Sequence, residues 1–97
     1  MSAGLQLDDV VHQRHRLAIL AALDEASKVE FGFLQTELEL TPGNLSRHLD
    51  VLEGAGYISI EKGYNGRRPK TSVRITKAGR AALRAEVAAL QEILNRP

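Results

Sequence analysis

Short polar side chains and one arginine follow a helix start signal in the middle of the chain. They are Thr41, Gly43, Asn44, Ser46, Arg47 and His48. Arginine can donate two hydrogen bonds to guanine, asparagine can pair with the edge of adenine, and serine can serve a base or a phosphate. This set predicts a helix that enters a DNA groove. The alternatives are an ordinary solvated helix start and, for His48, a partly buried helix residue.

A basic block follows that helix. Residues 62–84 hold eight lysines and arginines and no acid, whereas residues 1–61 carry a net charge of −6, and the overall charge of +1 conceals the contrast. Such a block is typical of a polyanion-binding surface. The residues expected on DNA phosphates or in a narrow minor groove are Lys62, Arg67, Arg68 and Lys70, with Arg74, Lys77 and Arg80 behind them. The alternative is a mobile charged turn that protects a sheet edge from aggregation.

The elements that must position these groups follow from the apolar pattern. Residues 8–26 predict a central helix, because the segment 17–23 is apolar right around a helix and needs cover on most sides. Residues 29–31 are compatible with a short strand at a sheet edge, and a second helix follows over residues 32–39. A third helix begins at Thr41-Pro42, since threonine can cap a helix and proline suits its first position. Residues 32–54 therefore predict a helix-turn-helix, with its turn at Glu39-Leu40.

A hairpin is predicted over residues 57–75. Residues 57–61 and 71–75 alternate with period two, which places Ile58, Ile60, Val73 and Ile75 on one face. The connection 62–70 contains Asn65-Gly66, which suits positive φ, and Pro69, which would remove a donor from a regular strand. We therefore expect residues 62–70 to form a projecting loop.

The last helix is expected over residues 77–95, capped by Thr76. Its apolar stripe, together with apolar residues near the start of the chain, predicts a dimer interface. The residues concerned are Leu5, Leu7, Val10, Val11, Leu83, Val87, Leu90 and Leu94. The alternative is that this helix packs only on the first helix of its own chain, because two heptads are few for a coiled coil.

Several classes of function are disfavoured. Length predicts one domain over residues 1–97, and the lack of cysteine removes disulfides and thiolate sites. No secretory signal and no membrane-spanning segment is evident, so a cytoplasmic protein is expected. His12 and His15 lack further ligands for a metal, and Ser46, Ser59 and Ser72 lack partners for catalysis. No cofactor, no metal and no enzymatic activity are therefore expected.

Five fragments together resemble the small winged-helix transcriptional regulators of the broad ArsR/MarR class, in particular stand-alone winged-helix domains. These are Val29-Glu-Phe-Gly-Phe-Leu34, Leu40-Thr-Pro-Gly-Asn-Leu-Ser-Arg-His-Leu49, Leu52-Glu-Gly-Ala-Gly-Tyr-Ile58, Gly66-Arg-Arg-Pro-Lys-Thr71 and Ile75-Thr-Lys-Ala-Gly-Arg80. The resemblance implies that the polar start of the third helix faces the major groove and that Arg67, Arg68 and Lys70 form wing contacts. It also implies homodimers on pseudo-palindromic operators. One departure is Glu39-Leu40, where such proteins often carry glycine, and a left-handed non-glycine residue costs about 1–2 kcal/mol.

The sequence thus predicts a mainly α (α+β) winged helix-turn-helix with a two-stranded wing and a long C-terminal helix. The expected function is that of a homodimeric regulator that binds double-stranded DNA sequence-specifically. The same fold could instead dock a protein partner. No polar pocket that would predict a small-molecule effector is apparent.

Overall fold

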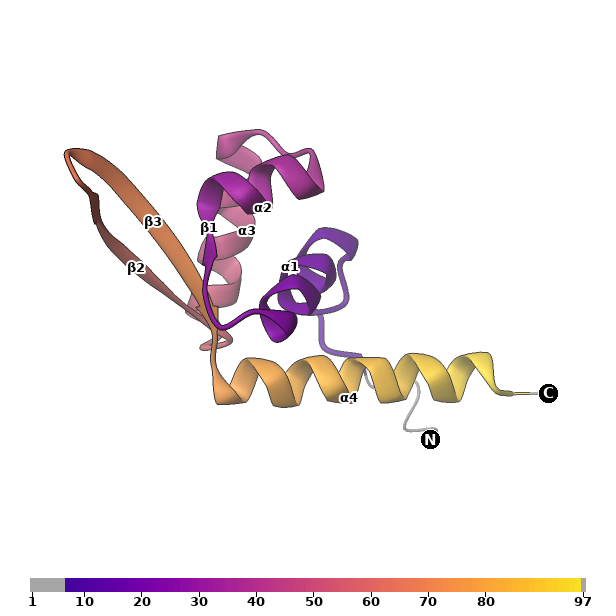
Figure 1. The fold of residues 1–97 in the computed structure, drawn as a ribbon. Helices are drawn as coiled ribbons and strands as arrows, with labels where there is room; N and C mark the ends of the chain where they lie inside the picture. Colours follow the sequence, from indigo (N-terminus) through magenta and orange to yellow (C-terminus); the bar gives the residue numbers. More distant parts are fainter. Residues whose placement is uncertain (1–6, 97) are drawn as a thin grey trace.

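Four helices and a three-stranded antiparallel sheet make up residues 7–96, the part of the chain that this computed structural model describes (Figure 1). The order is α1 (Arg14–Glu25), β1 (Val29–Glu30), α2 (Phe31–Leu38), α3 (Pro42–Gly54), β2 (Ile58–Asn65), β3 (Arg68–Ile75) and α4 (Lys77–Leu94). The strands lie in the order β1-β3-β2, so the hairpin gains a third, very short strand from the start of the helix-turn-helix. The expected winged helix-turn-helix is confirmed.

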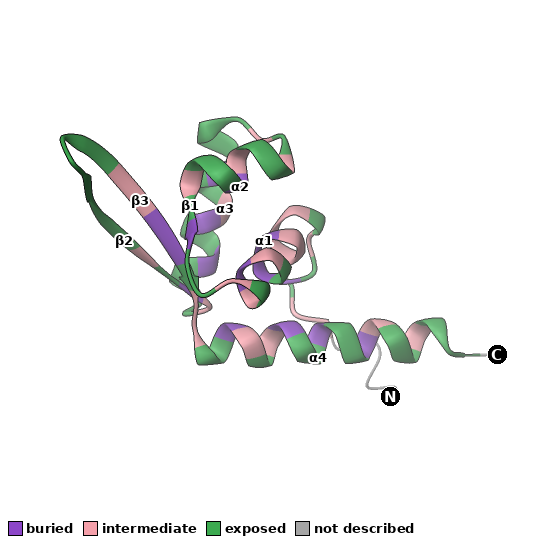
Figure 2. Ribbon diagram, viewed as in Figure 1, coloured by how far each residue is buried: buried purple, intermediate pink, exposed green. Residues whose placement is uncertain are grey.

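The core lies where α1, α2 and α3 meet the base of the sheet. Its fully covered side chains include Leu20 and Leu23 of α1, Leu34 of α2, Leu45 of α3 and Val73 of β3. They come from four different elements, and burying a side chain of this size contributes about 1.5–3 kcal/mol. Figure 2 shows buried segments in α1, α3 and the inner half of β3 and along α4, whereas the outer half of the hairpin is exposed.

The expected helix over residues 8–26 is shorter at its start, because α1 begins only at Arg14. Asp8 forms a turn instead: its Oδ1 accepts hydrogen bonds from the backbone N–H groups of Val10 (2.8 Å) and Val11 (3.4 Å). Side chains of this kind compete with helix formation. Gln13 then caps α1 by accepting from the N–H of Arg16 (2.8 Å).

The helix-turn-helix follows its predicted start and stop signals. Thr41 caps α3, and Pro42 is its first residue. Glu39 ends α2 in the left-handed region at φ 52°, and Glu39 is the one non-glycine residue with positive φ among the described residues. Its N–H and that of Leu40 bond the carbonyls of Thr36 (3.3 Å) and Gln35 (3.1 Å). The strain that a glycine would avoid is therefore tolerated, and the turn keeps its helix-ending hydrogen bonds.

The prediction of a loop over residues 62–70 is wrong. Both strands of the hairpin continue to a two-residue turn at Gly66-Arg67. Gly66 takes the positive φ of 66° that the first position of a type II′ turn requires. Pro69 lies opposite Tyr64, next to the pair Asn65–Arg68 that closes the turn. Because hydrogen-bonded and non-bonded pairs alternate, its nitrogen points away from β2 and no ladder bond is lost.

The long helix α4 packs its first half on α1, while its C-terminal half extends beyond the body of the molecule (Figure 1). The residues predicted to form the dimer interface therefore differ in how far they are exposed. Val11 and Leu83 are wrong for that role, because they are 0% and 6% exposed and belong to the core of their own chain. Val87 and Leu94 are exposed, Leu7, Val10 and Leu90 are half-buried, and Leu5 lies outside the described residues.

Candidate nucleic-acid interface

The start of α3 presents its polar side chains to solvent. Thr41 Oγ1 accepts a hydrogen bond from the N–H of Asn44 (3.1 Å), which fixes the first turn. Leu45 of this turn is fully buried in the core. The other side chains of the turn therefore point toward solvent. The exposed residues are Thr41, Gly43, Asn44, Ser46 and Arg47. The predicted groove-facing set is therefore free to meet a ligand, with His48 set further back.

His48 is half-buried against the start of α1. Arg16 of α1 approaches His48 Nδ1 with its Nη1 at 3.3 Å, and the ring of His15 lies 5.4 Å from that of His48, centroid to centroid. Partial burial, with the electrostatic effects of the neighbouring Arg16, His15 and Arg47, lowers the pKa of His48 below its usual 6.5. His48 is therefore a neutral side chain at neutral pH.

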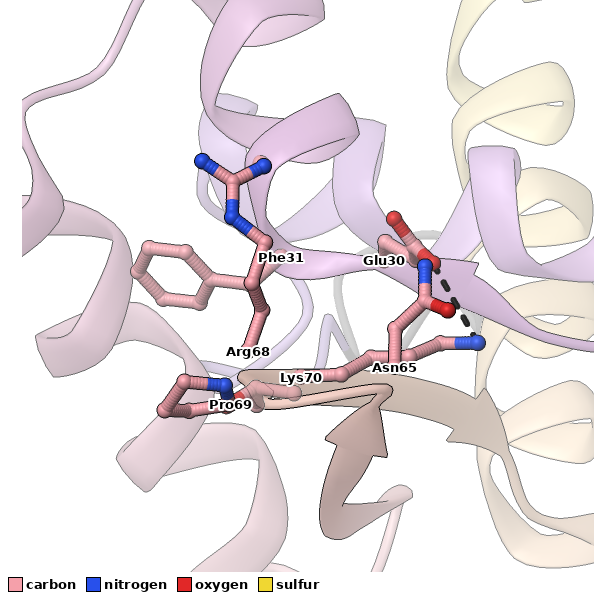
Figure 3. A pocket seen from close by; sticks show the side chains of 8 residues that line it. Glu30, Phe31, Asn65, Arg68, Pro69 and Lys70 are labelled. Carbon is pink, nitrogen blue, oxygen red and sulfur yellow. Dashed lines mark ion pairs between the residues drawn. The ribbon is translucent and has the colours of Figure 1, made fainter.

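Most basic residues of the wing are exposed to solvent. Lys62, Arg67 and Arg68 are exposed, and no ion pair holds them among the described residues. Lys70 differs, because its Nζ lies 3.3 Å from Glu30 Oε1 at the start of α2 (Figure 3). An exposed pair of this kind is worth little. It nevertheless points Lys70 toward the body of the protein rather than toward the tip of the wing.

A hollow of about 620 Å³ separates α3 from the base of the wing. Ser46 of α3 and Lys62 of β2 both line it, so the two predicted contact elements adjoin. Asp50 and Glu53 line the same hollow from the later turns of α3. Because carboxylates repel phosphates, a polyanion can approach the first turns of α3 and the outer wing more readily than the later turns.

Sequence reasoning missed Arg16 as a member of this region. It is joined to His48 across 32 residues of chain, so no local pattern reveals the contact. The one available signal was the run Arg14-His-Arg16 at the start of α1, where positive charge opposes the helix dipole.

Two further observations concern other kinds of site. Within residues 7–96, no three His, Cys, Asp or Glu side chains come together as possible metal ligands. No helix in the described part of the chain has the length and apolar character needed to cross a bilayer.

A helix-turn-helix followed by a β-hairpin wing defines the winged-helix class of domains. A family model described as "Winged helix DNA-binding domain" matches residues 15–94, and the chain belongs to this family. The family is one of DNA-binding domains rather than of enzymes.

Individual relatives agree with this assignment. The chain is 41% identical over 69 residues to the uncharacterized protein MJ0432 of Methanocaldococcus jannaschii, covering 71% of this chain and 75% of that protein. The structure of a transcriptional regulator homologue from Pyrococcus horikoshii matches with a TM-score of 0.83 and 32% identity, over 89% of this chain and 85% of that one. The Mycobacterium tuberculosis regulator MosR, whose structure is a complex with DNA, shares the fold at a TM-score of 0.71 and 20% identity, over 88% and 60% of the two chains.

Proposed function

We propose that this chain is a cytoplasmic transcriptional regulator that binds double-stranded DNA sequence-specifically as a homodimer. The first turns of α3 enter the major groove, where Asn44, Ser46 and Arg47 contact base edges. Thr41 and Gly43 lie close to the backbone, and the wing residues Lys62, Arg67 and Arg68 contact phosphates or the minor groove, with Lys70 at their margin.

One observation carries this proposal: the hollow that α3 and the wing share. Ser46 of α3 and Lys62 of β2 both line it, so a helix that can read bases lies beside a strand pair rich in cations. Phosphate contacts supply affinity, and base contacts supply sequence discrimination. The arrangement supports both on adjacent grooves of one duplex.

The dimer is supported by the exposed side of α4. Val87 is 42% exposed and Leu94 is 80% exposed, and both lie in the C-terminal half of α4. A two-fold dimer built there would read two half-sites about 34–36 Å apart, which multiplies the contacts of a single small domain.

Selection of duplexes from a random pool at physiological salt tests the proposal. We expect retained sequences that share a two-fold motif. Arg47→Ala should then lose about 1–3 kcal/mol of binding free energy on sites with the preferred base pair and little on sites without it. The matched control is Glu37→Gln on the exposed surface of α2, which should bind like the wild type.

Other outcomes would redirect the function. A pool from which no duplex is enriched contradicts DNA recognition and favours the docking of a protein partner on the same face. A uniform loss with Arg47→Ala on every sequence would make Arg47 a phosphate contact rather than a base contact.

A further inference from the structure

Arg16 is held in an unusual way for a side chain so close to the surface. Its guanidinium makes no ion pair among the described residues. Instead Nε donates to the carbonyl of Val10 (2.5 Å), Nη2 donates to the carbonyl of Asp9 (3.2 Å), and Nη1 reaches His48 Nδ1 (3.3 Å). Two backbone carbonyls therefore fix the guanidinium, and its remaining arm points at α3.

The contact with His48 determines where the imidazole carries its hydrogen. A guanidinium can only donate, so His48 Nδ1 must accept and cannot be protonated. The neutral ring then carries its hydrogen on Nε2. Nε2 has no hydrogen-bond partner among the described residues, and the His48 side chain is only half-buried.

The charges around His48 favour the same state. The groups facing it are Arg16 and His15 from α1 and Arg47 from its own helix, and with partial burial they lower its pKa. His15 is ordered in turn. Because Gln13 Oε1 accepts from the N–H of Arg16, the Gln13 amide turns its Nε2 toward His15 Nδ1 at 3.4 Å. The His15 ring then packs against His48 with an interplanar angle of 41°.

We propose that Arg16 is a positioning residue for DNA recognition: it holds His48 as the Nε2–H tautomer, so that α3 offers a fixed neutral donor to DNA beside Arg47. The inference rests on the proposed function. The acceptor is a lone pair on DNA, either the N7/O6 edge of a purine or a phosphate oxygen. In both cases His48 adds a hydrogen bond without adding a charge.

The tautomer is tested first, on the whole protein without DNA. Long-range ¹H–¹⁵N NMR should show His48 with the hydrogen on Nε2 at neutral pH. Arg16→Leu should give a mixture of the two tautomers, and Arg16→Lys should restore the Nε2–H form. A wild-type ring with its hydrogen on Nδ1 would overturn the inference.

Binding is tested with two substitutions of His48, which leave Arg16 in place. His48→Asn puts an acceptor near the position of Nδ1 but has no outer donor, and we expect about a tenfold loss of affinity for the selected duplex. His48→Gln carries an amide donor near the position of Nε2 and should recover most of that loss. Neither substitution removes a positive charge, so the dependence of affinity on salt should not change. Thermal unfolding of each variant separates a binding loss from a folding loss.

Modified duplexes locate the acceptor. If 7-deazapurine at one position abolishes the difference between wild type and His48→Asn, the acceptor is a base. If a methylphosphonate abolishes it, the acceptor is a phosphate.

The inference and the proposed function fail differently. If His48→Asn binds like the wild type while Arg47→Ala loses affinity, the inference is wrong and DNA recognition stands. If the wild type enriches no duplex at all, both are wrong.

Discussion

Glu86 of α4 is the one charged side chain that is buried within residues 7–96. Its Oε2 lies 2.6 Å from His12 Nδ1, and its Oε1 has no hydrogen-bond partner in the described structure. His12 is half exposed, so the pair joins the surface turn before α1 to the buried face of α4. A buried carboxylate depends on such a partner, because desolvation without hydrogen bonds is costly.

His12→Ala should therefore destabilise the fold more than replacement of the carboxylate itself. We expect His12→Ala to lower the free energy of unfolding by about 1–3 kcal/mol, since it leaves a buried acceptor unsatisfied. Glu86→Leu should be nearly neutral or stabilising, because an apolar side chain of similar volume needs no partner. Urea unfolding of both variants and of the double variant measures this. If His12→Ala costs nothing in the wild-type background, the contact contributes nothing to stability.

The lowered pKa of His48 gives the stability of the fold a pH dependence. Burial and the electrostatic effects of Arg16, His15 and Arg47 favour the neutral ring in the folded state, so the unfolded chain binds the proton more readily. The contribution of the neutral His48 ring to the free energy of unfolding is complete above pH 6.5. It is lost as the pH falls through and below that value. The free energy of unfolding should therefore rise with pH in the window just below 6.5. His48→Asn should flatten this rise, and an unchanged pH profile would contradict it.

At the scale of elements, α3, the hairpin and α4 are joined at one crowded point. The carbonyl of Tyr57 accepts from the N–H of Thr76 (3.0 Å), and Thr76 Oγ1 donates to the carbonyl of Gly56 (2.7 Å). Thr76 Oγ1 also accepts from the N–H of Gly79, which caps α4. A side-chain methyl at Gly79 would overlap the carbonyl oxygen of Tyr57. The angle at which α4 leaves the wing thus depends on a residue without a side chain.

Gly79→Ala should lower the free energy of unfolding by about 1–3 kcal/mol, despite the better helix propensity of alanine. The matched control is Gly32→Ala in α2, where a methyl group meets nothing within 4 Å, and this substitution should be neutral or stabilising. Chemical denaturation of both variants gives the comparison. Equal stabilities would show that the backbone at Tyr57 moves aside at no cost.

The wing is expected to act through charge. Arg67→Ala and Arg68→Ala should lower the affinity for every duplex alike and reduce the slope of log K against log salt by about one unit per lost phosphate contact. Lys28→Ala is a suitable control, because Lys28 pairs with Glu61 at the base of the sheet. Titrations at several salt concentrations measure the slope. An unchanged slope would exclude phosphate contacts by these arginines.

The whole molecule is elongated, with extents of 56 × 25 × 21 Å, because the wing and α4 both project from the helical body. Each projection carries exposed side chains: cations on the wing, and Val87 and Leu94 on α4. A two-fold pair joined through α4 would place two reading surfaces in one complex.

Val87→Glu combined with Leu94→Glu should give a folded monomer, because both side chains are exposed in the single chain. Sedimentation equilibrium should show half the wild-type mass, and affinity for a two-fold site should fall roughly a hundredfold or more as the second half-site is lost. Thr36→Glu on α2 adds charge away from α4 and should leave the sedimentation mass unchanged. A variant that still sediments like the wild type would contradict a dimer through this face.

Much of this fold could be predicted from the sequence, because the signals involved are local. Thr41-Pro42 and Thr76 begin helices by bonding to groups three residues away, and Leu45, Leu49 and Leu52 form a stripe through helix periodicity alone. The basic content of residues 62–84 is a matter of composition. These features were sufficient to predict the winged helix and the polar start of its third helix.

The remaining features depend on contacts between residues far apart in the chain, and only the tertiary structure decided them. Tertiary packing placed Val11 and Leu83 inside the core instead of on an interface. The two strands of the wing remain paired past Pro69, up to the turn. The approach of α1 to α3 brought Arg16 into contact with His48. A sequence pattern specifies which face of an element is apolar, but not which element covers that face, because this depends on how all the elements pack together.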